Sequence, residues 1–195
     1  MLRCAITDGS FDDLEGEKGR KRLALRCAEL AREGVQLLIL REKRLDAGAL
    51  VELGRAVVDA VRGLGMKVLI AGRVDVALAV GAEGVHLSGG VGELRPGQVR
   101  EVMPGAFVSV SCHEVGEVRR AALGGADLVL FAPVFGKSVG GEVVVGGVGL
   151  ERLREACVAA GRVPVLALGG VSAENGGECV GVGAAGVAGI RMFFG

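Results

Sequence analysis

The sequence contains no tryptophan and no tyrosine, and only 3% of its residues are aromatic. A hydrophobic core must therefore be built from Val, Leu and Ala rather than from large rings. Histidine is nearly absent as well, because His86 and His113 are the chain's 2 histidines. Imidazole is the side chain whose ordinary pKa lies closest to neutrality, so these are the two obvious candidates for proton transfer at pH 7.

Net charge is also missing, since 23 Lys and Arg balance 23 Asp and Glu. This balance excludes a general field that would draw the chain to nucleic acid or to a membrane surface. No apolar run approaches the roughly 20 residues of a membrane span. The N-terminal stretch carries a base and an acid within its first eight positions, unlike a signal peptide. We expect a cytoplasmic protein that recognises its partners locally, with no nucleic acid and no membrane among them.

The 5 cysteines form no CxxC pair and are scattered along the chain. This pattern favours reduced, buried thiols over disulfides or a zinc site. Cys112 alternates with Ser111 along an apolar run, so we expect its thiol to face the helices rather than to act as a nucleophile.

Short apolar runs of β type alternate with helical segments along the whole chain of 195 residues. Runs of this kind are typical of buried parallel strands. Eight repeats of an apolar run and a helical segment predict an α/β fold, a (β/α)8 TIM barrel formed by one domain over residues 1–195. An open doubly wound sheet is the alternative, but no GxGxxG follows the first run. The chain stops soon after the eighth run, so the last helix should be short or missing, which leaves a side for a partner subunit to cover. The expected strands are 2–7, 35–41, 67–71, 84–87, 107–111, 127–132, 163–168 and 186–191.

In such a barrel the active site lies at the C-terminal ends of the strands. Gly169 and Gly170 end the seventh run, where backbone N–H groups can approach a phosphate, although paired glycines can also simply form a tight turn. Arg41 and Lys43 end the second run two residues apart, so both could face one phosphoryl group, or lie in a solvated charged loop.

His113 follows the fifth run and is the first candidate for a general acid and base. Its alternatives are a polar cap of the following helix or a hydrogen bond to Ser111. His86 lies within GVHL at alternate spacing, and it could point into the barrel or be a satisfied core group. We therefore rank it second.

Several motifs together resemble the thiamin phosphate synthase and TenI family. They are LREK (40–43), RVDVALAVGAEGVHL (73–87), SVSCHEVGEVRRAALGGADLVLFAPVF (109–135), VGLERL (148–153) and VPVLALGGVSAEN (163–175). The resemblance covers nearly the whole chain. It implies a (β/α)8 enzyme of thiamin biosynthesis in which Arg41 and Lys43 contact a diphosphate.

The synthase branch couples hydroxymethylpyrimidine diphosphate to thiazole phosphate with Mg²⁺, and this chain departs from its motifs. Ala71-Gly72 stands where that branch has Asn-Asp, and Gly89-Gly90-Val91 stands where it has Gln-Glu-Asp. A Thr-x-Thr-Lys segment is replaced by Lys137-Ser138-Val139-Gly140. Both metal-binding aspartates are thus absent, and Mg²⁺ prefers carboxylate ligands. Asp75 remains, but its place in the first turn of a helix explains it.

The TenI branch also lacks these acids and implies a thiazole tautomerase, an aromatising isomerase that needs neither metal nor cofactor. In this interpretation His113 is the general acid and base. Ser111 supports it, and Gly169, Gly170, Ile190 and Arg191 hold the phosphate. The alternatives are a divergent thiamin phosphate synthase, which is a transferase requiring Mg²⁺, and a non-catalytic barrel. The expected ligand is a phosphorylated thiazole or thiamin phosphate, and a homodimer is a further expectation.

Overall fold

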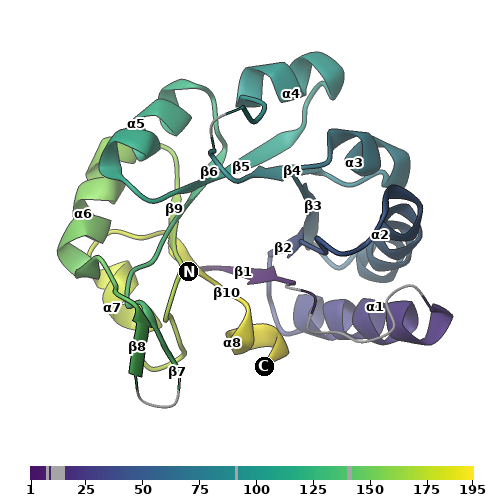
Figure 1. Cartoon of the computed structure of the whole chain (residues 1–195), viewed down its shortest axis with the longest axis horizontal. Helices are drawn as coiled ribbons and strands as arrows, with labels where there is room; N and C mark the ends of the chain where they lie inside the picture. The colour runs from purple at the N-terminus through teal and green to yellow at the C-terminus, as the bar shows by residue number, and fades with distance from the viewer. Residues whose placement is uncertain (8, 10–15, 91, 140–141) are drawn as a thin grey trace.

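The computed structural model describes residues 1–7, 9, 16–90, 92–139 and 142–195. Eight parallel strands close into a barrel, so the expected fold is confirmed and the open sheet is excluded. Figure 1 shows the ring of strands with helices around it. In spatial order the barrel strands are β1 (Leu2–Ile6), β10 (Gly186–Gly189), β9 (Val165–Ala167), β6 (Leu128–Phe131), β5 (Phe107–Cys112), β4 (Gly84–Leu87), β3 (Lys67–Ala71) and β2 (Leu37–Leu40).

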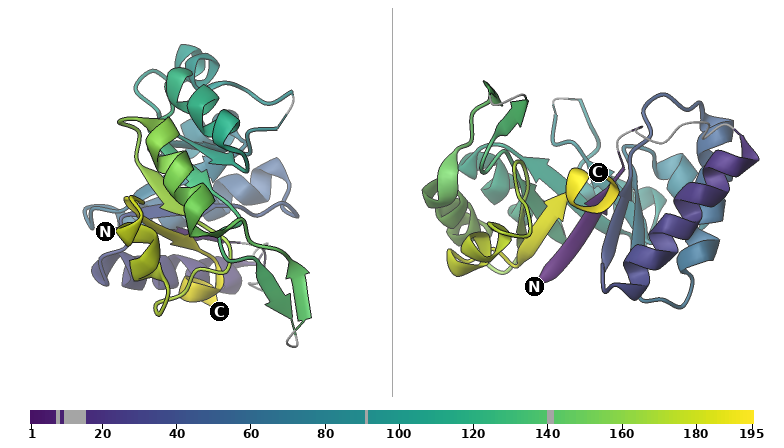
Figure 2. Two further views of the ribbon diagram at one scale, coloured as in Figure 1. Left: turned by 90° about the vertical axis from the view of Figure 1, so that its left-hand side faces the viewer. Right: turned by 90° about the horizontal axis from the view of Figure 1, so that it is seen from below.

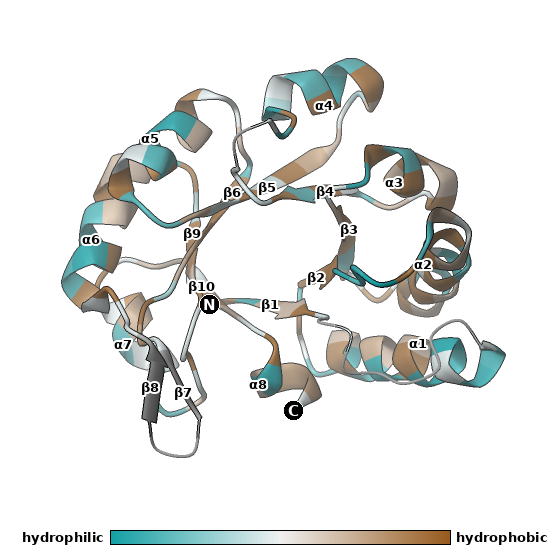
Figure 3. Ribbon diagram, viewed as in Figure 1, coloured by the Kyte–Doolittle hydropathy of each residue, from teal (hydrophilic) through white to brown (hydrophobic). Residues whose placement is uncertain are grey.

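Each barrel strand is followed by a helix, as right-handed crossovers between parallel strands require. The helices turn apolar faces to the barrel and polar faces to solvent (Figure 3). The last helix has four residues, which confirms that it is short. The helices are α1 (Glu17–Arg32), α2 (Ala47–Val61), α3 (Val74–Val80), α4 (Pro96–Val102), α5 (Val115–Leu123), α6 (Gly149–Ala160), α7 (Gly176–Gly181) and α8 (Arg191–Phe194).

The core has two layers because successive strand residues point to opposite faces. Inside the barrel, Ile39, Leu69 and Leu130 belong to a compact apolar cluster. A larger cluster lies between the strands and the helices, and it includes Val85, Val110 and Cys112. The outward direction predicted for Cys112 is therefore confirmed, and all five cysteines are free.

Two strands lie outside the eight that the sequence predicts. They are β7 (Lys137–Val139) and β8 (Glu142–Val145), which pair antiparallel between β6 and α6. The hairpin projects from the end of the barrel at which the strands finish (Figure 2). A short antiparallel pair of this kind can form between neighbouring segments, so it does not change the alternation of barrel strands and helices.

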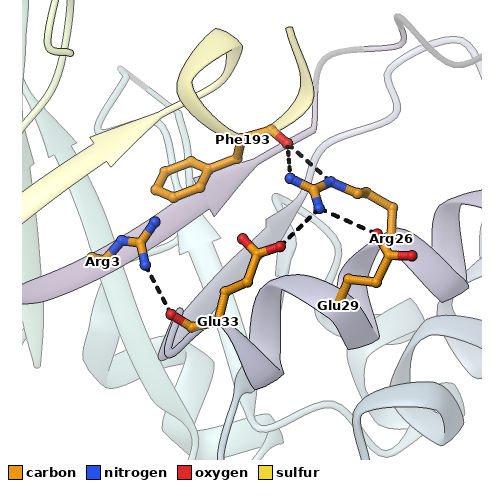
Figure 4. A network of polar contacts seen from close by, with 5 residues as sticks. All are labelled: Arg3, Arg26, Glu29, Glu33 and Phe193. Carbon is orange, nitrogen blue, oxygen red and sulfur yellow. Dashed lines mark hydrogen bonds and ion pairs between the residues drawn. The ribbon is translucent and has the colours of Figure 1, made fainter. Parts of the chain in front are cut away.

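The short helix α8 is anchored against the first βα unit (Figure 4). Phe193 is buried, and the Arg3 guanidinium lies 5.3 Å from the centroid of its ring. Arg26 donates to the Phe193 carbonyl from Nε at 3.3 Å and Nη2 at 3.1 Å, and it also pairs with Glu33. Four residues thus cover part of the side that a full final helix would cover. Among the described residues, no helix has the length and apolarity needed to cross a membrane.

Candidate active site

A pocket of about 600 Å³ opens at the C-terminal ends of β2 to β5. Its position agrees with the general location of active sites in barrels of this type. The pocket brings together five of the predicted residues, namely Arg41, Lys43, His86, Ser111 and His113. Its other lining residues are Leu40, Glu42, Leu45, Leu50, Ala71, Gly72, Arg73, Ser88 and Glu93.

The cations enter the pocket from the end of β2. The Arg41 N–H donates to Thr7 Oγ1 at 2.9 Å, and the Thr7 N–H donates to the Ile39 carbonyl at 3.1 Å. These bonds continue the pairing of β1 and β2 past the last strand residue. Lys43 lies in the following turn, yet both cations line the pocket as their spacing predicts. A phosphoryl group in this part of the pocket would meet two positive side chains.

His86 points into the barrel, because its neighbours Val85 and Leu87 belong to the outer core layer. Its Nδ1 lies 2.8 Å from Ser109 Oγ, and its Nε2 lies 3.0 Å from Ser111 Oγ. Burial lowers the pKa of His86 to about 4, with a smaller opposite effect from Glu93 and a lowering effect from Arg41. His86 is therefore a neutral imidazole at physiological pH. Both interpretations of His86 left open by the sequence apply: its ring points into the barrel and lines the pocket, and both ring nitrogens have hydrogen-bond partners.

His113 follows β5 at the pocket rim. Its backbone N–H donates to Glu117 Oε2 at 2.6 Å, and its ring Nδ1 lies 2.8 Å from the Ala132 carbonyl oxygen. A carbonyl can only accept, so Nδ1 carries the hydrogen of this bond. Nε2 of the neutral ring is then the atom able to accept a proton. The alternative prediction of a hydrogen bond between His113 and Ser111 is wrong. The Ser111 hydroxyl instead lies within hydrogen-bond distance of His86, which is on the neighbouring strand β4.

Three charged groups of the lining were not predicted as site residues, namely Glu42, Glu93 and Arg73. Glu93 accepts from the Ser88 N–H at 2.7 Å and from the Ser88 hydroxyl, which ties the loop after β4 together. Arg73 follows β3 and binds Asp75 through Nε at 2.9 Å and Nη2 at 2.6 Å. The hydrogen bond from Arg73 lowers the pKa of Asp75 to about 2, so this pairing accounts for Asp75 beyond its helical position. Arg73 lies two residues after the third expected strand (67–71), a position that could have marked it, whereas no pattern marked Glu93.

The two glycines after β9 pack closely on the segment that follows β6. A Cβ on Gly169 would lie 2.7 Å from Pro133 Cα, and one on Gly170 would lie 2.4 Å from the Gly136 carbonyl oxygen. Both residues have positive φ, at 91° and 67°. Packing and backbone conformation thus require glycine here, whether or not a phosphate binds.

Four of the proposed phosphate ligands lie outside the lining of the pocket, as far as the described residues define it: Gly169, Gly170, Ile190 and Arg191. The eighth strand also ends earlier than expected, at Gly189 rather than at 191. As a result Ile190 precedes α8, and Arg191 is an exposed residue of its first turn.

Comparison with known proteins agrees with this architecture. A family model described as thiamine monophosphate synthase matches residues 4–193. The chain belongs to the thiamine monophosphate synthase family. A putative thiamine-phosphate synthase of Geobacter sulfurreducens is 41% identical over 174 residues, covering 87% of this chain and 78% of that protein. A thiamine-phosphate synthase of Methanoculleus marisnigri is 36% identical over 180 residues, covering 91% and 83%.

A solved structure of similar fold is the thiamine phosphate pyrophosphorylase from Pyrococcus furiosus. Its TM-score is 0.79 at 26% sequence identity, with 97% of this chain and 85% of that chain covered. Family membership therefore rests on sequence and structure together, and both extend over nearly the whole barrel.

The residues of this family member do not fit a magnesium ion in the family's manner. Ala71 and Gly72 line the pocket where the family resemblance places an acid, and Gly89 and Gly90 replace part of the second acidic motif; its last position, Val91, lies outside the described residues. In the part of the chain that is described, no three His, Cys, Asp or Glu residues form a group that could hold a metal ion. Hard cations such as Mg²⁺ need several oxygen ligands, so the described residues do not form a magnesium site by themselves.

Proposed function

We propose that this chain acts in thiamin biosynthesis on a phosphorylated thiazole bound in the pocket of β2 to β5. The reaction best supported is the coupling of thiazole phosphate to hydroxymethylpyrimidine diphosphate, a transferase reaction. The observation that carries it is the 36% identity to a thiamine-phosphate synthase over 91% of the chain, together with Arg41 and Lys43 at the pocket wall. This favours the synthase over the isomerase that the sequence pattern placed first.

In the coupling, the thiazole nitrogen forms a bond to the pyrimidine methylene carbon as the bond from that carbon to diphosphate breaks. The leaving group carries off the electron pair, and negative charge grows on its oxygens. Arg41 and Lys43 would stabilise that charge directly, since positioned cations act most strongly where charge develops. The thiazole needs only to be held in line with the methylene carbon.

A second function is favoured by the arrangement at His113. Its Nδ1–H is held by the Ala132 carbonyl, which leaves Nε2 free of that bond at the rim of the pocket. Tautomerisation of an exocyclic thiazole carboxylate phosphate removes one proton and delivers another, and the product ring is aromatic. One oriented imidazole is sufficient for both transfers.

The two reactions are separated by assaying the purified chain with each substrate set, with and without added Mg²⁺. Release of diphosphate from the pyrimidine substrate, with formation of thiamin phosphate, supports the transferase. Aromatisation of the thiazole tautomer, followed by NMR without the pyrimidine, supports the isomerase. Tight binding of thiazole phosphate with neither turnover would instead identify a ligand-binding barrel.

A further inference from the structure

The interior of the barrel holds a short chain of polar groups that the proposed reactions do not use. It runs from Ser109 through the His86 ring to Ser111, and its members come from β4 and β5. His86 and Ser109 are direct neighbours in the strand register. Ser109 is fully buried, whereas Ser111 lines the pocket. This row of three polar groups therefore has one end in the apolar core, at Ser109, and the other end at the ligand site, at Ser111.

The buried end decides how the protons are arranged. Among the described residues, the Ser109 hydroxyl has one partner, Nδ1 of His86. If Nδ1 carried the ring proton, the Ser109 hydroxyl hydrogen would have no acceptor, and such an unsatisfied buried donor is unfavourable. The hydroxyl is satisfied when it donates to an unprotonated Nδ1. The single proton of the neutral ring must then be on Nε2.

The proton on Nε2 fixes the role of the other serine. Nε2–H donates to Ser111 Oγ, so one lone pair of that oxygen is occupied from within the barrel. The hydroxyl hydrogen of Ser111 has no acceptor among the described protein groups and can point into the pocket. We propose that Ser109 and His86 form a positioning relay that holds Ser111 as a hydrogen-bond donor toward the ligand.

A donor at this place selects ligands that present an acceptor. A ring nitrogen, a carboxylate oxygen or a phosphate oxygen would bind to Ser111, whereas an N–H or O–H group would meet a donor already in place. That this acceptor belongs to a phosphorylated thiazole rests on the proposed function. The arrangement of protons on Ser109, His86 and Ser111 does not depend on it. The low pKa of His86 agrees with a ring that stays neutral during binding.

The relay is tested by ¹⁵N NMR of histidine-labelled full-length protein at pH 7. The chain has 2 histidines, so a His113→Gln variant leaves His86 as the only signal. We expect one tautomer, with a protonated Nε2 and an unprotonated Nδ1. In Ser109→Ala we expect the same tautomer but an altered ¹⁵N shift of Nδ1, because the unprotonated nitrogen has lost the hydroxyl that donates to it. Val110→Ala, on the same strand but in the outer layer, should leave the Nδ1 shift unchanged. A proton on Nδ1 in the wild-type chain, or an unaltered Nδ1 shift in Ser109→Ala, would overturn the relay; if Ser109→Ala fails to fold, the wild-type spectrum still decides.

A second measurement tests the donor role at Ser111. Glutamine at position 86 can place an amide N–H near the Nε2 position, whereas the shorter asparagine reaches only the Nδ1 position. With thiazole phosphate as the calorimetric probe, we expect His86→Gln to bind within about 3-fold of wild type and His86→Asn about 10-fold more weakly. Equal losses in both variants would contradict the donor role. If the wild-type chain fails to bind thiazole phosphate at all, the proposed function is wrong, and the NMR tautomer still decides the relay.

Discussion

The His113 imidazole and the Ala132 carbonyl are joined by a hydrogen bond of 2.8 Å, which links the residue after β5 to the residue after β6. This bond orients the imidazole ring and uses the hydrogen on Nδ1. Nε2 is then the ring nitrogen that can accept or release a proton. A catalytic imidazole is usually oriented in this way by a second group. The pocket therefore contains one histidine that is oriented at its rim, His113, and one that is enclosed in its wall, His86.

Replacement of His113 should separate proton transfer from binding. In His113→Ala we expect the rate of thiazole tautomerisation to fall by about 10²- to 10⁴-fold, as for the loss of a general acid and base. Thiazole phosphate affinity, measured by calorimetry, should change less than about 3-fold. His113→Asn is the matched control, since its amide can keep a bond to Ala132 but cannot carry the proton. Turnover of either variant at the wild-type rate would remove His113 from the mechanism.

The two cations after β2 should account for binding of the diphosphate. We expect Arg41→Met and Lys43→Met each to weaken the binding of inorganic diphosphate by about 10-fold, because each loses a charge-assisted contact. Added salt should reduce the difference from wild type. The matched control is Arg44→Met, since Arg44 is adjacent but lies outside the pocket lining. If Arg44→Met weakens binding as much, the effect is one of general charge.

Glycine at position 170 should be required for stability independently of any ligand. Gly170→Ala adds a Cβ 2.4 Å from the Gly136 carbonyl oxygen at a φ of +67°. We expect the free energy of unfolding in urea, without ligand, to fall by about 1–3 kcal/mol. Gly177→Ala is the control, because it lies in α7 with open space around its Cβ and should stabilise by about 0.5–1 kcal/mol. An unchanged stability of Gly170→Ala would show that the segment after β6 can move away.

The anchor of α8 should contribute strongly to the stability of the barrel. Phe193 is 3% exposed, and its truncation in Phe193→Ala leaves a cavity between α8 and the first βα unit. We expect a loss of about 3–5 kcal/mol in the free energy of unfolding. Leu123→Ala should change it by less than about 0.5 kcal/mol, because Leu123 is 84% exposed. Equal thermal midpoints for the two variants would mean that α8 is not anchored as described.

Buried His86 should make the protein less stable in mild acid. Its pKa falls from 6.5 to about 4 on folding, so between these values the unfolded chain binds a proton that the folded chain does not. Stability from this group is complete above pH 6.5 and is lost as the pH falls toward 4, by about 3 kcal/mol in total. Urea unfolding at pH 7 and pH 5 measures the slope. His86→Gln should show a shallower slope than wild type, and parallel slopes would contradict the shift.

Much of this site could be predicted from the ends of apolar runs. Arg41, Lys43, Ser111 and His113 line one pocket because the carboxyl ends of parallel strands lie on one face of a barrel. Glu93 could not be found this way, since it enters from a loop five residues after Ser88 and is held there by a hydrogen bond between the two. Arg191 was expected to end the eighth strand, but that strand ends at Gly189 and Arg191 is the first residue of α8.

The sequence by itself determined the alternation of eight strands with helices, and with it the barrel, since apolar period and glycine punctuation are local properties. It also placed the chain in its family through motifs spread along that alternation. Only the tertiary structure showed that β7 pairs with β8, that Phe193 is buried and that the Ser111 hydroxyl contacts His86. Side-chain alternation shows which way His86 faces, but the register of β4 on β5 is a long-range property, and it is this register that places the ring between two serine hydroxyls.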